Sequence, residues 1–181
     1  RGNGATVLTQ TGEVRQRADS ASINVTLQGA GGPLTLGPGQ VLTGSGRISG
    51  TVQVDGAIAP DQPYAPLGPI GTVAVDGGAL LTLRNGADTV IDIASPASFD
   101  RISNGGSVQL GGRLVLNSMN GYVPALGTSF DLISGGMVSG RFASVVFPPE
   151  FGELDAQIEV LADRVRLTIV APLMVDGFED P

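Results

Sequence analysis

The sequence predicts an all-β protein, a β-solenoid whose short strands turn at corners rich in glycine and asparagine. From Gly29 onward, apolar pairs or alternations recur between glycines, only a handful of residues apart. No apolar run is long enough for a helix that buries one face. The chain has 28 glycines and 12 prolines but also an ordinary apolar fraction of 41%, which a disordered chain would lack. We therefore expect the glycines and prolines to form turns between ordered strands. An antiparallel β-sandwich of short strands is the alternative architecture.

The pattern is clearest between residues 111 and 149. Three apolar runs, Leu114–Leu116, Phe130–Ile133 and Phe142–Phe147, are separated by Gly, Pro, Asn and Ser turns. Because an isolated pair of strands is only marginally stable in water, we expect similar strands to pack against these three runs. The chain supplies candidates at residues 34–36, 41–42, 48, 52–54, 58, 71–75, 79–83, 90–93, 108–110, 158–161 and 165–170.

Turn signals separate these strands. Asn85-Gly86, Asn104-Gly105-Gly106 and Ala162-Asp163 each read as a turn. Residues 61–69, which with Pro60 hold four prolines, cannot form a central strand and predict an extruded loop. We therefore divide the chain into an N-terminal strand or arm (1–28), a solenoid body (29–170) and an acidic tail (171–181). Because the first residue is Arg1, we expect the chain to be a processed piece.

One internal similarity predicts the coil length. VQVDGAIA at 52–59 and VAVDGGALL at 73–81 share a pattern at a spacing of 21 residues. If these are equivalent coils, Asp55 and Asp76 stack about 4.8 Å apart, which would raise one pKa and could bind a cation. The simpler interpretation, which we favour, is that both Asp-Gly pairs form turns at a corner.

Composition excludes several function classes. A net charge of −7 argues against nucleic acid as a partner, because phosphate binding needs clustered positive charge. The chain has no cysteine and no histidine, which leaves neither thiolate chemistry nor the usual zinc ligands. No apolar run approaches the length of a membrane span. We expect no catalytic, cofactor or metal site, and therefore no enzyme.

Several motifs occur in a specific order: GRISGTVQVDGAIAP, then PLGPIGTVAVDGGALLTL, then Gly121-Tyr122-Val123-Pro124, Phe130-Asp131-Leu132-Ile133 and Gly140-Arg141-Phe142. This order resembles the distal β-helix of autotransporter-type passenger proteins and related bacterial surface proteins. The resemblance implies a right-handed β-helix, export to the surface of a Gram-negative bacterium, and a role in adhesion, display or scaffolding. The tail VDGFEDP is similar to a short D-G-F-E ending on exported proteobacterial proteins.

We therefore expect a non-catalytic extracellular module: a stalk, an adhesin segment, or the subunit of a self-assembling filament. Exposed solenoid ends template the addition of another chain unless they are capped. Strand patterns at the two ends mark the candidates for pairing between subunits, which are Ile23, Val25 and Leu27 at one end and Val165, Leu167 and Ile169 at the other.

A carbohydrate-binding or carbohydrate-active β-helix is the alternative, with a host or glycan surface as the partner. Its groove would lie beside the proline-rich loop, with Tyr64 as its aromatic platform. An aromatic content of 4% and the lack of any general base other than a carboxylate disfavour this function.

Overall fold

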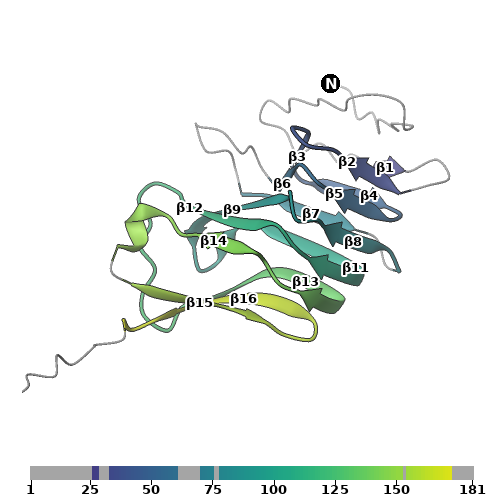
Figure 1. The fold of residues 1–181 in the computed structure, drawn as a ribbon. Coiled ribbons are helices and arrows are strands. Elements are labelled where there is room, and N and C mark those ends of the chain that lie inside the picture. Colours follow the sequence, from purple (N-terminus) through teal and green to yellow (C-terminus); the bar gives the residue numbers. More distant parts are fainter. Residues whose placement is uncertain (1–25, 29–32, 61–69, 76–77, 153, 173–181) are drawn as a thin grey trace, which may run out of the picture.

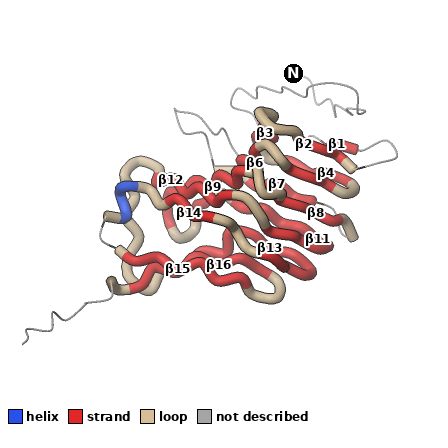
Figure 2. Tube along the Cα trace, viewed as in Figure 1, coloured by secondary structure: helices blue, strands red, loops and turns tan. Residues whose placement is uncertain are grey.

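In a computed structural model, the structure describes residues 26–28, 33–60, 70–75, 78–152 and 154–172. Of the described residues, 61% lie in strands and 2% in helix, and they form a β-solenoid of about three turns with parallel stacked strands. Figure 1 shows the strands stacked along one axis, with β1 to β3 near one end and the β15–β16 hairpin at the other. The tube in Figure 2 is almost entirely strand and loop. The predicted solenoid is confirmed over the antiparallel sandwich.

The strands are short in the first coils and longer in the last ones. They are β1 (Thr26–Gln28), β2 (Leu34–Leu36), β3 (Val41–Thr43), β4 (Gly46–Ser49), β5 (Val52–Val54), β6 (Ala57–Ala59), β7 (Thr72–Val75), β8 (Leu80–Leu83), β9 (Asp88–Ser95), β10 (Ser98–Phe99), β11 (Arg101–Leu110), β12 (Arg113–Ser118), β13 (Ser129–Gly140), β14 (Ser144–Val146), β15 (Asp155–Val160) and β16 (Arg164–Val170). One 3-10 turn, Pro149–Phe151, follows β14.

The strands stack in three parallel ladders. The first runs through β1, β4, β7, β11 and β13, and the second through β2, β5, β8 and then the later parts of β11 and β13. The third runs through β3, β6, β9, β12 and β14. Strand β11 therefore belongs to two ladders, pairing with β7 through Arg101–Asn104 and with β8 through Ser107–Gln109.

The turn expected at Asn104-Gly105-Gly106 is instead a bend inside β11. The Asn104 side chain is 4% exposed; it donates to the Ser107 carbonyl (2.7 Å) and accepts from the Gly106 N–H (2.9 Å), so it satisfies backbone groups at the bend. A Cβ at Gly106 would lie 2.0 Å from the Ala79 carbonyl oxygen, so this bend requires glycine. The chain changes direction where the sequence indicated, and the register of β11 with β13 shifts by one residue across the bend.

The core is formed by inward side chains that lie in register from coil to coil. Val52, Leu81 and Val108 pair along the second ladder, and all three are 0% exposed. In the last coils the rings of Phe99 and Phe130 pack edge to face, with centroids 5.3 Å apart and planes at 86°. Burial along the ladders alternates, as the strand patterns predicted.

The repeat at 52–59 and 73–81 does not mark equivalent coils. Val52 and Val54 lie in β5 of the second ladder, whereas Val73 and Val75 lie in β7 of the first. Val54 pairs with Leu83, so the coil at this point spans 29 residues rather than 21. The shared pattern reflects a common local requirement, an apolar strand that ends in a turn, rather than a common position in the coil.

We expect Leu114→Ala to lower the free energy of unfolding by about 2–5 kcal/mol, because Leu114 is 0% exposed in the middle of the third ladder and the substitution leaves a cavity. Leu126→Ala is the matched control, since Leu126 is 58% exposed, and it should change stability by less than about 0.5 kcal/mol. Urea denaturation followed by circular dichroism measures both; equal effects would contradict the assigned core.

Candidate functional site

The C-terminal end of the solenoid, where the parallel ladders stop, carries the features that sequence analysis linked to function. Strand β16 pairs antiparallel with β13, and β15 pairs antiparallel with β16. The sheet order β1-β4-β7-β11-β13-β16-β15 makes β15 its last strand. Among the described residues, β15 is therefore the edge of this sheet at one end, and β1 and β2, which pairs with β5 alone, are its edges at the other; Figure 1 shows β1 and β15 at opposite ends of the stack.

This topology corrects the prediction for Val165, Leu167 and Ile169. All three are 0% exposed, and their strand, β16, is hydrogen-bonded on both sides within the chain. The hairpin folds so that its second strand covers β13 and its first strand lies outermost. The strand available for pairing at this end is thus β15, which the sequence analysis did not select.

At the N-terminal end, Leu27 lies in β1 and pairs with Ile48 of β4. Its predicted companions Ile23 and Val25 lie outside the described residues. Within the part of the chain that the structure describes, β1 pairs with β4 alone.

The outer backbone of β15 follows from the hydrogen bonding of the hairpin. The Leu161 N–H donates to the Arg164 carbonyl at 2.8 Å. Because hydrogen-bonded and non-hydrogen-bonded pairs alternate along an antiparallel ladder, the N–H and C=O groups of Ala156, Ile158 and Val160 point away from β16. These groups form the outer edge of the sheet.

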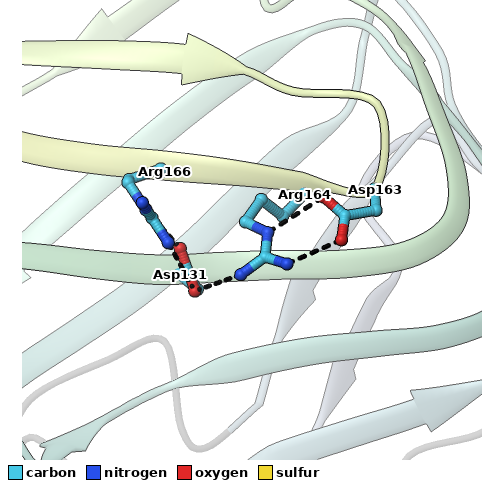
Figure 3. Close-up of polar contacts among 4 residues, drawn as sticks. All are labelled: Asp131, Asp163, Arg164 and Arg166. Carbon is cyan, nitrogen blue, oxygen red and sulfur yellow. Dashed lines mark hydrogen bonds and ion pairs between the residues drawn. The ribbon is translucent and has the colours of Figure 1, made fainter.

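An ion-pair network fastens the hairpin to the solenoid (Figure 3). Asp131 of β13 accepts from Arg166 Nε (2.7 Å) and Nη2 (3.1 Å) and from Arg164 Nη1 (2.9 Å). Arg164 also donates to both oxygens of Asp163 in the hairpin turn. The hydrogen bond from Arg166, with that from Arg164, holds the pKa of Asp131 below its ordinary value. One carboxylate thus joins two arginines of β16 to β13.

Asp131→Asn should loosen the hairpin, because it removes the charge that binds both Arg164 and Arg166. Asp131 is more than a third exposed, so solvent screening limits the expected loss of stability to about 1 kcal/mol. Asp163→Asn is the matched control, because Asp163 pairs with Arg164 inside the turn. Amide hydrogen exchange in β16 should accelerate more in the first variant than in the second; the reverse order would contradict the network's role.

A second polar cluster is buried on the third ladder. Asp100 and Asp92 are both 0% exposed. Asp100 accepts from the Gly71 N–H (2.7 Å) and the Asp92 N–H (3.0 Å), and Asp92 accepts from the Asn117 side chain (2.7 Å). Burial raises the pKa of Asp100 to about 7, against the lowering effect of its backbone hydrogen bonds, and the nearby Asp92 adds to the rise.

This cluster is a structural tie between β7, β9 and the segment that follows β10. Asp100 joins the beginning of β7 to β9, and Asn117 of β12 extends the contact to the next coil. No group of three or more His, Cys, Asp or Glu side chains that could hold a metal ion occurs in the described ranges. Sequence analysis missed Asp100, although a carboxylate placed between Phe99 and an apolar strand was a usable signal.

Protonation of Asp100 predicts an unusual pH dependence. The folded state binds its proton more tightly than the unfolded chain, whose Asp pKa is near 3.8. The free energy of unfolding should therefore fall by on the order of 2–3 kcal/mol between pH 5 and 8, because this carboxyl is ionised in the unfolded chain but keeps its proton in the folded one up to about pH 7. The chain has no histidine, and the lowered pKa of Asp131 places its own titration below this window.

Urea midpoints at pH 5 and pH 8 measure this effect. Asp100→Asn should remove most of the difference, whereas Asp163→Asn, at the surface, should preserve it. If the unmodified protein is equally stable at both pH values, the raised pKa of Asp100 in the folded state is contradicted.

The alternative in which Asp55 stacks on Asp76 required equivalent coils, whereas β5 and β7 lie in different ladders. Asp55 follows Val54, whose partner in the next coil is Leu83, and the neighbour that Asp55 meets is Arg84, at 3.2 Å. Asp76 lies outside the described residues. Arg113 and Asp88 form a similar pair, at 2.7 Å, between paired positions of β12 and β9. Opposite charges, rather than like charges, face each other between these coils.

Tyr64 and the proline-rich segment 61–69 fall outside the described residues, as do residues 1–25 and the tail from 173 onward. Among the helices that the structure describes, none has the length and apolar character needed to cross a membrane. The sequence matches no protein-family model, and no curated protein matches it. The resemblance to autotransporter passengers therefore remains a prediction.

Proposed function

We propose that this chain is a non-catalytic structural module that works outside the cell: a stalk or adhesin segment at the surface of a Gram-negative bacterium, or the subunit of an extracellular filament. The observation that carries the proposal is the edge of the main sheet at each end, β1 and β15, among the described residues. Solenoids with open ends extend by adding strands from a neighbour.

The state of the described carboxylates supports a structural role over a catalytic one. Asp55, Asp88 and Asp131 are held in ion pairs with arginines, which fixes them as links between strands. Asp100, whose pKa rises to about 7, is fully buried. General acid–base catalysis needs such a group within reach of a substrate, and burial prevents that contact.

Export and surface location rest on the resemblance of the ordered motifs between GRISG and GRF to autotransporter passengers. A solenoid body suits display, because each coil adds length without requiring a larger core. The outer faces carry ion pairs that link adjacent coils, such as Arg84 with Asp55 and Arg113 with Asp88.

Deleting residues 1–28, which removes β1, should abolish polymers of the purified chain and leave the solenoid body folded. Negative-stain electron microscopy reports polymers, and circular dichroism reports folding. Deleting residues 173–181 is the control and should leave polymers intact. If the full chain forms only separate short rods, the filament function falls and the stalk or adhesin function remains.

A further inference from the structure

We infer that β15 is the strand through which one copy of this chain binds the next, by parallel pairing with β1 of a second copy in a head-to-tail arrangement. This inference rests on the filament form of the proposed function, and it identifies the interface. The partner is a second copy of the same chain, and the contact is heterologous: the C-terminal end of one molecule meets the N-terminal end of another.

Strand direction is the first argument. Strands β1, β4, β7, β11 and β13 all run the same way, because every pairing between them is parallel. β16 runs the opposite way, and β15 reverses direction once more. The edge strands β1 and β15 therefore run in the same direction. Copies stacked with their axes aligned would continue the sheet with the parallel pairing that its interior already uses.

The backbone of β15 is suited to accept another strand. Its six residues pair with β16 without a register shift, from Asp155 with Val170 to Val160 with Val165. It contains no proline and no bulge, two of the features by which natural edge strands resist addition, and its charged residues are Asp155 and Glu159. The outward N–H and C=O groups of Ala156, Ile158 and Val160 thus form a regular edge.

Apolar side chains at both ends give the contact a hydrophobic component. At the C-terminal end Val160 and Leu161 are 39% and 38% exposed, and Val146 and Phe147, at the end of the third ladder, are 42% and 39% exposed. At the N-terminal end Leu34 and Leu42 pack against the core but remain only partly buried. Covering such residues favours association by about 25 cal/mol per Å² of apolar surface.

Charge selects the head-to-tail arrangement over a symmetric one. The C-terminal end is acidic, because residues 147–161 contain four carboxylates and no arginine: Glu150, Glu153, Asp155 and Glu159. At the opposite end, the described residues 26–28 and 33–54 contain Arg47 and no carboxylate. Two β15 edges would bring carboxylates together and repel each other, whereas β1 brings no carboxylate to β15.

Cysteine cross-linking tests the pairing directly, because the natural chain contains no cysteine. The variant carries Gln28→Cys in β1 and Gln157→Cys in β15. Six inter-strand steps separate these strands within one molecule, about 29 Å at 4.8 Å per step, which is far beyond the reach of a disulfide. Oxidation should therefore yield a ladder of covalent multimers on a denaturing, non-reducing gel, and reduction should collapse it to monomer.

The control variant carries Gln157→Cys with Arg84→Cys. Arg84 directly follows β8, which lies between β5 and β11 in the middle of the stack and so away from both ends. It should form multimers at less than about a tenth of the yield of the first variant. A second variant, Ala156→Pro, removes one outward N–H of β15 and should reduce polymer length at least tenfold, whereas Ala156→Val, which keeps that N–H, should preserve it.

Three outcomes would overturn this interface. Polymers that form normally but do not cross-link between positions 28 and 157 would overturn this interface and leave the filament function standing. Absence of polymers from the unmodified chain would overturn both. Equal polymer lengths in the Ala156→Pro and Ala156→Val variants would show that the outer backbone of β15 makes no contact.

Discussion

The structure depends on the parallel register between successive coils. Inward side chains lie over their counterparts in the next coil, as Val52, Leu81 and Val108 do, so a continuous core from all three ladders is buried along the stack. Because side chains alternate between faces, a slip of one residue would expose that core and bury the arginines and aspartates of the outer face. The same register places Arg113 beside Asp88 and Arg84 beside Asp55. Core packing and surface ion pairs therefore stabilise a single arrangement.

Sequence reasoning predicted the fold class and most strands because alternation and glycine spacing are local signals. It did not predict register, since that depends on how much chain each corner consumes. The repeat at 52–59 and 73–81 shows the difficulty. Its two copies have the same sequence pattern, yet the first lies in the second ladder and the second lies in the first ladder. The edge at the C-terminal end was also beyond local reasoning. Residues 155–160 and 164–170 carry similar strand patterns, and only the folded hairpin determines which of them is outermost.

A parallel stack cannot end without leaving unpaired backbone groups, and the hairpin shows how this chain ends one. β16 satisfies β13 by antiparallel pairing, and the contacts of Arg164 and Arg166 with Asp131 hold it in place. The unpaired groups are thereby moved to β15 rather than removed. Among the described residues, the inner strands form backbone hydrogen bonds with neighbours on both sides. The edge strands, such as β15, have one side of their backbone turned away from any described strand.

The unequal length of the coils has a consequence for how this chain can change over evolution or by engineering. Leu36 and Val54 are 18 residues apart, Val54 and Leu83 are 29 apart, yet both pairs are neighbours in the same ladder. Each coil adds one strand to the ladder whatever its length, and the extra residues of a longer coil lie in the segments between strands. The junction between Pro60 and Gly71 is held on its C-terminal side by the Asp100 carboxylate and by the Arg101 N–H, which donates to the Gly71 carbonyl. Foreign peptide inserted between Pro60 and Gly71 would leave the register of every ladder unchanged. The solenoid could therefore present an inserted epitope at a fixed position along its axis.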